Sequence, residues 1–217
     1  MLVEDRMVTD VHVLSEDDTI EKAIQIMQKY NIRHLPVVNK EKKCIGIVTD
    51  RDIRSAVPSI FSTDEHQEIF YKYVKEIMTK EVITCHPLDY VEDIARLFYQ
   101  HNIGCLPVEK NERLVGILTQ TDVLQTFIEL TAANKPGSKI EIIFDGKSKT
   151  ITNIIKILSD LKVHIHNLLI YQDRHNPDTT ILAIRLNTIN PLPAITTLQR
   201  HGYLVKIPLS SGDANGQ

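Results

Sequence analysis

The sequence predicts a mixed α/β protein built from two unlike parts, and three observations lead to this prediction. Residues 3–53 and 74–123 resemble each other block by block. A short run of Asn, Lys, Pro, Gly and Ser at 134–138 then interrupts the pattern, as a linker does. The charge balance also changes, because residues 1–137 carry 16 Lys and Arg against 22 Asp and Glu, whereas residues 138–217 carry 9 against 6. A chain of 217 residues fits between one and two domains of roughly 150 residues each.

Each copy of the repeat contains the same three blocks in the same order. These are a segment that starts with Val and ends with Met, then Asn-Ile-x-x-Leu-Pro-Val, then Gly-x-x-Thr-x-x-Asp. The blocks begin at Val3, Asn31 and Gly46 in the first copy and at Val74, Asn102 and Gly116 in the second. Three blocks at a nearly constant offset indicate two copies of one structural unit. Because a unit of roughly 50 residues buries little surface, we expect the two copies to pack against each other.

Each copy is predicted to be β-α-β-β-α. The strands are expected at 11–14, 35–38 and 44–48 in the first copy and at 82–84, 106–108 and 114–118 in the second. Apolar residues recur on one face of each first helix. They are Ile20, Ala23, Ile24 and Met27 in the first copy, and Val91, Ile94, Ala95 and Phe98 in the second. A second helix follows each Thr of the third block. We expect repeat one at 1–57, a connector at 58–73 with a helix around 65–74, and repeat two at 74–133.

The C-terminal part is predicted to be β-α-β-β-α-β. The elements are expected at 139–144, 150–161, 163–171, 180–186, 192–201 and 203–207. This order is that of a ferredoxin-like domain, an open sheet with both helices on one face. Gly202 stands where a helix end needs a left-handed residue. The domain is expected to span 139–209, after a linker at 134–138 and before a disordered tail at 210–217.

Composition excludes several function classes. A net charge of −3 argues against a general nucleic-acid binder. No apolar run approaches the ~20 residues that cross a bilayer, and the acidic start is unlike a signal peptide. The three cysteines form no CxxC pair, which favours a reduced, cytoplasmic chain.

No catalytic residue and no metal site is expected. His164 and His166 share a strand face but have no Cys or carboxylate at ligand-like spacing. Cys105 has no identifiable base to activate it. The glycine-rich nucleotide motifs and the G-x-S-x-G nucleophile motif do not occur in the sequence. These observations favour a protein that is not an enzyme.

The third block is the most informative motif, because it places a Thr and an Asp where a strand meets a helix. The pairs are Thr49 with Asp52 and Thr119 with Asp122. A helix N-terminus is a natural seat for phosphate, and a carboxylate there can accept two hydrogen bonds from a ribose diol. Thr-x-x-Asp is also close to a capping box, which would serve only to start the helix. Both interpretations can hold together.

On these blocks, residues 1–132 resemble a tandem pair of CBS domains, the modules that form a pseudo-twofold Bateman module. The resemblance implies that the chain binds AMP, ADP, ATP or S-adenosylmethionine in a cleft between the repeats. It implies that Asp52 and Asp122 hold ribose hydroxyls, with Thr49 and Thr119 near ribose or phosphate. It also implies homodimers formed through the CBS pairs.

The same resemblance implies a wider set of cleft residues around the second and third blocks. These are Ile32, Arg33, His34, Arg51, Ile103, Gly104, Cys105 and Thr121, with Thr9 and Lys80 closing the pocket. Our hypothesis is that phosphates lie toward Arg33, Arg51 and Lys80, because polyphosphate in an acidic region needs local cations. The base would lie toward Gly104 and Cys105. Arg33 could instead be a solvated surface charge.

Residues 138–208 resemble an ACT domain, a small-molecule sensor, through their element order, Asp145-Gly146 and Val163-His164-Ile165. Lys162 and His164 stand where amino-acid-binding members usually have Gly and Asn, so an alternative role is pairing across a dimer. The combination resembles bacterial acetoin-utilisation regulatory proteins. Two hypotheses follow. The chain is a ligand-responsive regulator acting through its ACT-like part or on a target enzyme, or it is a constitutive homo-oligomeric scaffold without a nucleotide ligand.

Overall fold

The computed structural model describes residues 1–56 and 64–206, and its contacts divide the chain into two compact units, Met1–Thr126 and Phe127–Gln217. The boundary falls inside one helix, α4. The expected tail at 210–217 and the part of the connector at 58–63 lie outside the described residues.

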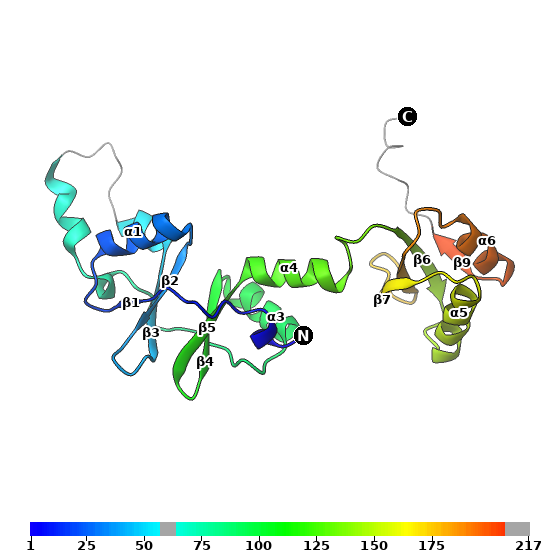
Figure 1. The fold of residues 1–217 in the computed structure, drawn as a ribbon, viewed down its shortest axis with the longest axis horizontal. Coiled ribbons are helices and arrows are strands. Elements are labelled where there is room, and N and C mark those ends of the chain that lie inside the picture. The colour runs from blue at the N-terminus through cyan, green and yellow to red at the C-terminus, as the bar shows by residue number, and fades with distance from the viewer. Residues whose placement is uncertain (57–63, 207–217) are drawn as a thin grey trace. The chain divides into compact units, whose positions relative to one another are not determined.

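The first unit contains both copies of the repeat, and each copy has a helix, a β-hairpin and a second helix (Figure 1). The first copy consists of β1 (Leu14–Ser15), α1 (Ile20–Tyr30), β2 (His34–Val38), β3 (Cys44–Thr49) and α2 (Asp50–Ala56). The second consists of α3 (Val91–His101), β4 (Cys105–Lys110), β5 (Arg113–Thr119) and α4 (Gln120–Leu130). The described part of the unit also contains the 3-10 helices η1 (Val3–Asp5), η2 (Asp64–Tyr71) and η3 (Val74–Glu76).

The two first helices confirm the predicted apolar faces. Their buried positions are Ile20, Ala23 and Met27 on α1, and Val91, Ile94 and Phe98 on α3. Both helices end at an Asn in the left-handed conformation, with φ of 52° at Asn31 and 51° at Asn102. Asn adopts this conformation more readily than most residues. This explains why both copies of the second block begin with Asn.

The opening strands of the repeats differ from the prediction. β1 covers only Leu14–Ser15, which pair in parallel with Val37 and Val38, so the strand predicted at 11–14 is shifted toward the helix. The strand predicted at 82–84 is wrong, because the chain there makes only one parallel bridge, from Cys85 to Val108. The helix predicted at 65–74 is the 3-10 helix η2. Residues 11–12 and 82–83, which were predicted to begin these two strands, instead line cavities that are described below.

The opening segment of each repeat packs into the core of the other repeat. Val3 is buried in the core of repeat two, where Met7 also packs, while Val74 is buried in the core of repeat one with Met78 against it. Figure 1 shows the dark-blue start of the chain beside α3 of repeat two, where the Val3 N–H donates to the Asp89 carbonyl at 2.9 Å. The repeats therefore exchange segments, and each completes the other.

Backbone hydrogen bonds and two glycines hold the exchanged segments in place. Val8 bonds reciprocally with Ile117 at 2.9 and 3.0 Å, and Thr79 bonds with Ile47 at the same two distances. A side chain on Gly46 would collide with the Met78 sulfur, and one on Gly116 would meet the Met7 sulfur at 2.6 Å. Each Gly of the third block thus leaves room for the Met of the other repeat.

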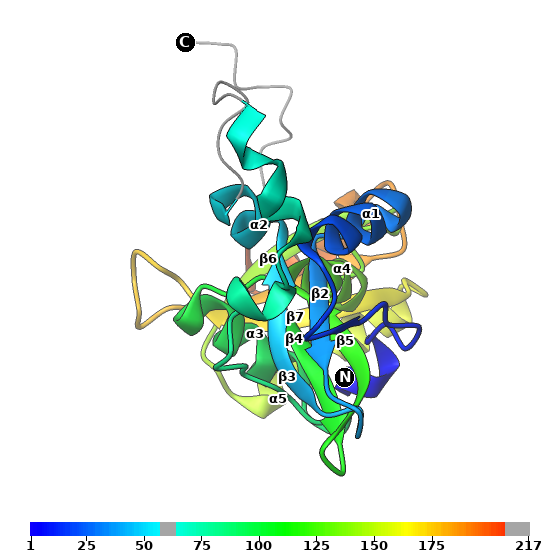
Figure 2. The ribbon, with the colours of Figure 1, turned by 90° about the vertical axis from the view of Figure 1, so that its left-hand side faces the viewer.

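The hairpins of the two repeats lie next to each other, as the blue and green strands in Figure 2 show. Both hairpins are antiparallel, with His34 opposite Thr49 and Cys105 opposite Thr119. Between the hairpins, the Leu114 N–H donates to the Lys42 carbonyl at 2.9 Å. The second and third blocks of each repeat are therefore neighbours on adjacent strands.

The second unit has the predicted β-α-β-β-α-β order. Its elements are β6 (Ser138–Phe144), α5 (Ser148–Asp160), β7 (Ile165–Gln172), β8 (Thr180–Leu186), α6 (Leu192–Arg200) and β9 (Leu204–Lys206). The antiparallel sheet has the order β7-β8-β6-β9. Alternate residues of β6 pack with residues of both helices in one core, so the helices cover the same face. Gly202 has a φ of 84°, as predicted. Across the described ranges, no helix is both long enough and apolar enough to span a membrane.

Candidate functional site

Both third blocks fold into the same capped turn. In repeat one, the backbone N–H and the hydroxyl of Thr49 donate to Oδ2 of Asp52 at 2.8 and 2.7 Å, and the Asp52 N–H donates to the Thr49 hydroxyl at 3.2 Å. The corresponding distances for Thr119 and Asp122 are 2.8, 2.6 and 3.3 Å. The capping interpretation therefore describes both copies. Because these bonds use only Oδ2, they leave Oδ1 of each carboxylate outside the cap.

The first cavity, of about 330 Å³, contains the Asp52 turn. Its other wall is the exchanged segment after η3, including Thr79, Glu81 and Ile83. Of the predicted site residues it brings together His34, Thr49, Arg51, Asp52, Ile103, Gly104 and Cys105. The volume is within the range of small-molecule pockets, and the lining mixes apolar and polar groups as such pockets do.

The second cavity, of about 570 Å³, adjoins the first, because the two share lining residues of both repeats, among them His34 and Gly104. Its wall includes the exchanged segment after η1, with Val8, Asp10 and His12. Of the predicted site residues it brings together Ile32, Arg33, His34, Arg51, Gly104, Thr119 and Thr121. His12 is held by stacking on Tyr30, with the ring centres 3.6 Å apart.

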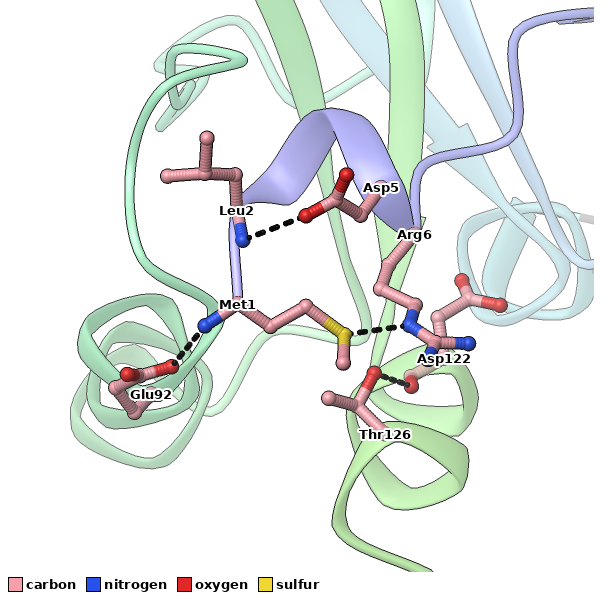
Figure 3. A network of polar contacts seen from close by, with 7 residues as sticks. All are labelled: Met1, Leu2, Asp5, Arg6, Glu92, Asp122 and Thr126. Atoms are coloured by element: carbon pink, nitrogen blue, oxygen red, sulfur yellow. Dashed lines mark hydrogen bonds and ion pairs between the residues drawn. The ribbon is translucent and has the colours of Figure 1, made fainter. Parts of the chain in front are cut away.

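Asp122 does not line the second cavity. It lines a smaller cavity of about 170 Å³, together with Asp5, Arg6, Met7 and Gln125. Figure 3 shows the Arg6 guanidinium group beside Asp122 at the start of α4, and the Thr126 hydroxyl donating to the Asp122 carbonyl at 2.8 Å. The position that matches Arg6 in repeat two is Ile77. The two carboxylates of the repeat thus have different surroundings.

Thr9 and Lys80 line neither of the first two cavities. Their neighbours do, with Val8 and Asp10 in one and Thr79 and Glu81 in the other. Val11 and His12 also line the one cavity and Val82 and Ile83 the other, so each segment supplies several consecutive residues to its wall. The sequence analysis missed Asp10 and Glu81, which directly follow Thr9 and Lys80 in the chain.

His34 lies in the wall that the two cavities share. A side chain on Gly104 would meet the Nε2 atom of His34 at 2.5 Å, so the imidazole occupies the space that Gly104 leaves open. Burial is the main reason that the pKa of His34 is lowered, and Arg33 adds to this, while Asp50 and Asp52 act in the opposite direction. The imidazole is therefore neutral near neutral pH.

Cys105, which lines the first cavity, and the nearby Cys44 are both buried thiols. Burial raises the pKa of Cys105 to about 12 and that of Cys44 to about 11. A thiol with such a pKa does not form the thiolate that acts as a nucleophile at neutral pH. Among the residues that the structure describes, no three His, Cys, Asp or Glu side chains gather where a metal ion could bind.

Solved structures share the fold of the first unit. The chain is 32% identical to the CBS domain pair of protein MJ0100, solved in complex with 5′-methylthioadenosine and S-adenosyl-L-methionine. That match has a TM-score of 0.52 and covers 62% of this chain and 98% of the other. A Vibrio cholerae protein described as a putative acetoin utilization protein matches with 32% identity and a TM-score of 0.53, over 63% of this chain and 98% of the other.

Curated proteins match over the same region. Inosine-5′-monophosphate dehydrogenase of Methanocaldococcus jannaschii is 36% identical over 120 residues, which are 55% of this chain and 22% of that enzyme. Homoserine O-acetyltransferase of Methanococcus vannielii matches over 24% of its length. The chain thus spans about a quarter of the enzymes it matches. A CBS domain-containing protein of Dictyostelium discoideum is 31% identical over 143 residues, which are 64% of this chain and 99% of the other.

The family model for the CBS domain matches residues 3–59 and 74–129, more than half of the chain. These ranges contain both copies of the three blocks and both capped turns. They also contain the exchanged segments that form the walls of the two larger cavities. The chain belongs to the CBS domain family, as a tandem pair.

Proposed function

We propose that this chain is a non-catalytic regulatory protein that binds an adenosine ligand between its CBS repeats. The observation that carries the proposal is the Asp52 turn, which stands in a cavity of about 330 Å³ with one carboxylate oxygen outside its cap. A free carboxylate oxygen next to the Thr49 hydroxyl suits a ribose diol, and the apolar Ile83 and Ile103 suit an adenine ring. The MJ0100 complex supports this ligand class.

The cavity walls suggest how binding would be transmitted. Asp52 belongs to repeat one and Ile103 to repeat two, so a ligand would contact both repeats. A ligand shifts a conformational equilibrium only if it binds the two arrangements unequally. Contacts with both repeats provide this difference whenever the angle between the repeats changes. AMP, ADP, ATP and S-adenosylmethionine are the candidates.

We further propose that the second unit is an ACT-like domain that receives the signal or passes it to a target enzyme. Its strand order β7-β8-β6-β9 and its helices on one face support this assignment. The proposed division is a CBS pair at 1–133, a linker at 134–138 and the ACT-like domain at 139–209. The Vibrio cholerae relative makes acetoin metabolism the first pathway to test.

We propose that the protein forms a homodimer through its CBS pairs. Leu124, Phe127 and Ile128 on α4 support this, because they are exposed at the spacing of one helix face. Sedimentation of the full chain would measure the oligomeric state, and a monomer at micromolar concentration would contradict the proposal.

Isothermal titration calorimetry of AMP, ADP, ATP and S-adenosylmethionine, with the parent and Asp52→Asn, tests the ligand proposal. Asn also caps helices well, so the fold should persist while the diol loses a charged acceptor. We expect at least one ligand to bind the parent and to bind Asp52→Asn about tenfold or more weakly.

Asp93→Asn is the matched control, because Asp93 is an exposed carboxylate in the first turn of α3 and lines neither of the two larger cavities. It should bind like the parent. If none of the four ligands binds while the protein sediments as a stable dimer, the ligand proposal fails and the constitutive scaffold takes its place.

A further inference from the structure

We infer that the two larger cavities take different ligands. The first takes an adenosine derivative whose 5′ group is uncharged or cationic, and the second takes a phosphate-bearing anion. This inference rests on the proposed function and assigns a ligand class to each cavity. It is carried by the separation of charged side chains between two cavities that share one wall.

The charged residues that line both cavities do not explain why the two cavities would bind different ligands. His34, Asp50 and Arg51 line both cavities. Asp50 pairs with Arg54 at 2.8 Å, so its charge is compensated from outside the cavities, and Arg51 contributes one positive charge to each. What distinguishes the cavities is therefore the set of charged groups that each does not share.

The unshared charged groups of the two cavities differ in their balance. Asp52 and Glu81 line only the first cavity, with no unshared cation, whereas Arg33, Asp10 and His12 line only the second. Together with Arg51, the first wall has one excess negative charge and the second has one excess positive charge. Opposite charge at short range favours binding and like charge disfavours it, most strongly in a partly enclosed site.

The diol-binding carboxylate and the arginine cluster consequently belong to different sites. A nucleoside whose ribose is held by Asp52 has its 5′ group in a cavity where Glu81 is the unshared charge and Arg33 is not part of the wall. A phosphate there would meet a carboxylate, whereas a thioether or a sulfonium cation would not be repelled. This revises the hypothesis that a single nucleotide uses Asp52 and Arg33 together.

The second cavity suits an anion through a hydroxyl as well as its charge. Thr121 lines it beside Arg33 and Arg51, and these side chains are donors that phosphate oxygens accept. The Thr119 hydroxyl also lines it but already donates to Asp122. Asp122, which would repel a phosphate, lies in the separate small cavity with Arg6. The Asp122 carboxylate therefore lies behind Thr119 and beside Arg6, and not in the wall of the second cavity itself.

The test is calorimetry on the full chain with four probes, namely 5′-methylthioadenosine, S-adenosylmethionine, AMP and inorganic pyrophosphate. The variants are Glu81→Gln and Arg33→Gln, compared with Asp52→Asn. We expect 5′-methylthioadenosine to depend on Asp52 and not on Arg33. We expect Glu81→Gln to weaken S-adenosylmethionine and to strengthen AMP, each by about three- to tenfold, with 5′-methylthioadenosine unchanged.

Pyrophosphate should show the converse dependence. Arg33→Gln should weaken its binding about tenfold, while Asp52→Asn should not weaken it. Glu21→Gln and Arg96→Gln are the matched controls, because both residues are exposed on first helices and line neither cavity. Both controls should bind every probe like the parent, and thermal unfolding of each variant should show that it is folded.

Two results would overturn the inference, and they are distinguishable. If the phosphate-bearing probes bind with full dependence on Asp52 and none on Arg33, both ligand classes share the first cavity, and the inference fails while the proposed function stands. If the parent binds none of the four probes, the proposed function fails and the inference fails with it.

Discussion

Repeat one and repeat two share one skeleton but have different sites. Both have a one-faced first helix ending at a left-handed Asn, both have an antiparallel hairpin, and both cap the second helix with Thr and Asp. Where repeat one has Arg33 and His34, repeat two has Gly104 and Cys105. Arg6 lines a small cavity with Asp122 of repeat two, whereas the matching residue Ile77 packs against the core of repeat one. The two repeats thus share their packing, while the side chains at the cavities differ between them.

The largest expected effect tests the shared skeleton. Leu35 and Leu106 occupy the same place in the second block, and both are fully buried. Leu35→Ala and Leu106→Ala should each lower the free energy of unfolding by about 2–5 kcal/mol, through lost burial and the cavity left behind. Chemical denaturation followed by circular dichroism measures this.

Leu88→Ala serves as the control, since Leu88 is 57% exposed and its truncation should change the free energy of unfolding by less than about 0.5 kcal/mol. A large loss for one buried Leu and almost none for the other would break the equivalence of the two cores.

The next effect tests the exchanged segments. Gly46→Ala and Gly116→Ala place a side chain against the sulfur of Met78 and of Met7, so each should cost about 1–3 kcal/mol of unfolding free energy. The two losses should be similar, because the two contacts are alike. Thermal or chemical unfolding measures both.

A double variant separates this contact from other effects of the glycines. In a Met78→Ala background, Gly46→Ala should cost less than it does alone, because the methionine that it displaces has been removed. Equal costs in both backgrounds would show that the glycine is needed for a reason other than the exchanged Met.

The smallest effect concerns His34 and its counterpart Cys105. Burial lowers the pKa of His34 in the folded chain. As the pH falls, His34 of the unfolded chain therefore takes up a proton near its ordinary pKa of 6.5, whereas His34 of the folded chain does so only at a lower pH. This contribution to stability is complete above about pH 6.5 and is lost as the pH falls toward the folded pKa. Cys105, with a pKa raised to about 12, does not titrate in this range.

Unfolding free energies measured between pH 5 and 7.5, a range chosen to bracket the ordinary His pKa of about 6.5, would sharpen this difference between the repeats. His34→Gln should flatten part of the acid-side slope, and Cys105→Ser should leave the slope as it is. An unchanged slope in His34→Gln would show that other histidines carry the acid dependence.

Local patterns predicted most of the fold. The apolar faces of α1 and α3, the hairpin strands and the alternating order of the second unit all follow from periodicity and turn residues. The failures are the opening strands, where the sequence around Val82 is apolar enough for a strand but the chain lines a cavity instead. The exchange of segments was not predicted, because two matched blocks are compatible with packing in their own repeat or in the other.

The candidate site shows the same division. The capped turns with Asp52 and Asp122 were predictable, because the cap is formed within four residues. Their different surroundings were not, since the partner of each turn comes from a segment distant in the sequence. Glu81 and Asp10 were missed for the same reason, although they directly follow Lys80 and Thr9 in the chain.

The exchange of opening segments fixes where the pair can flex. Val3 is anchored in one core and Leu14 in the other, and Val74 and Cys85 are anchored in the converse way. A rotation between the repeats must therefore be absorbed by the stretches between these anchors. Those stretches form cavity walls. A bound molecule would therefore contact the residues that a rotation displaces, and its shape would limit the angle between the repeats.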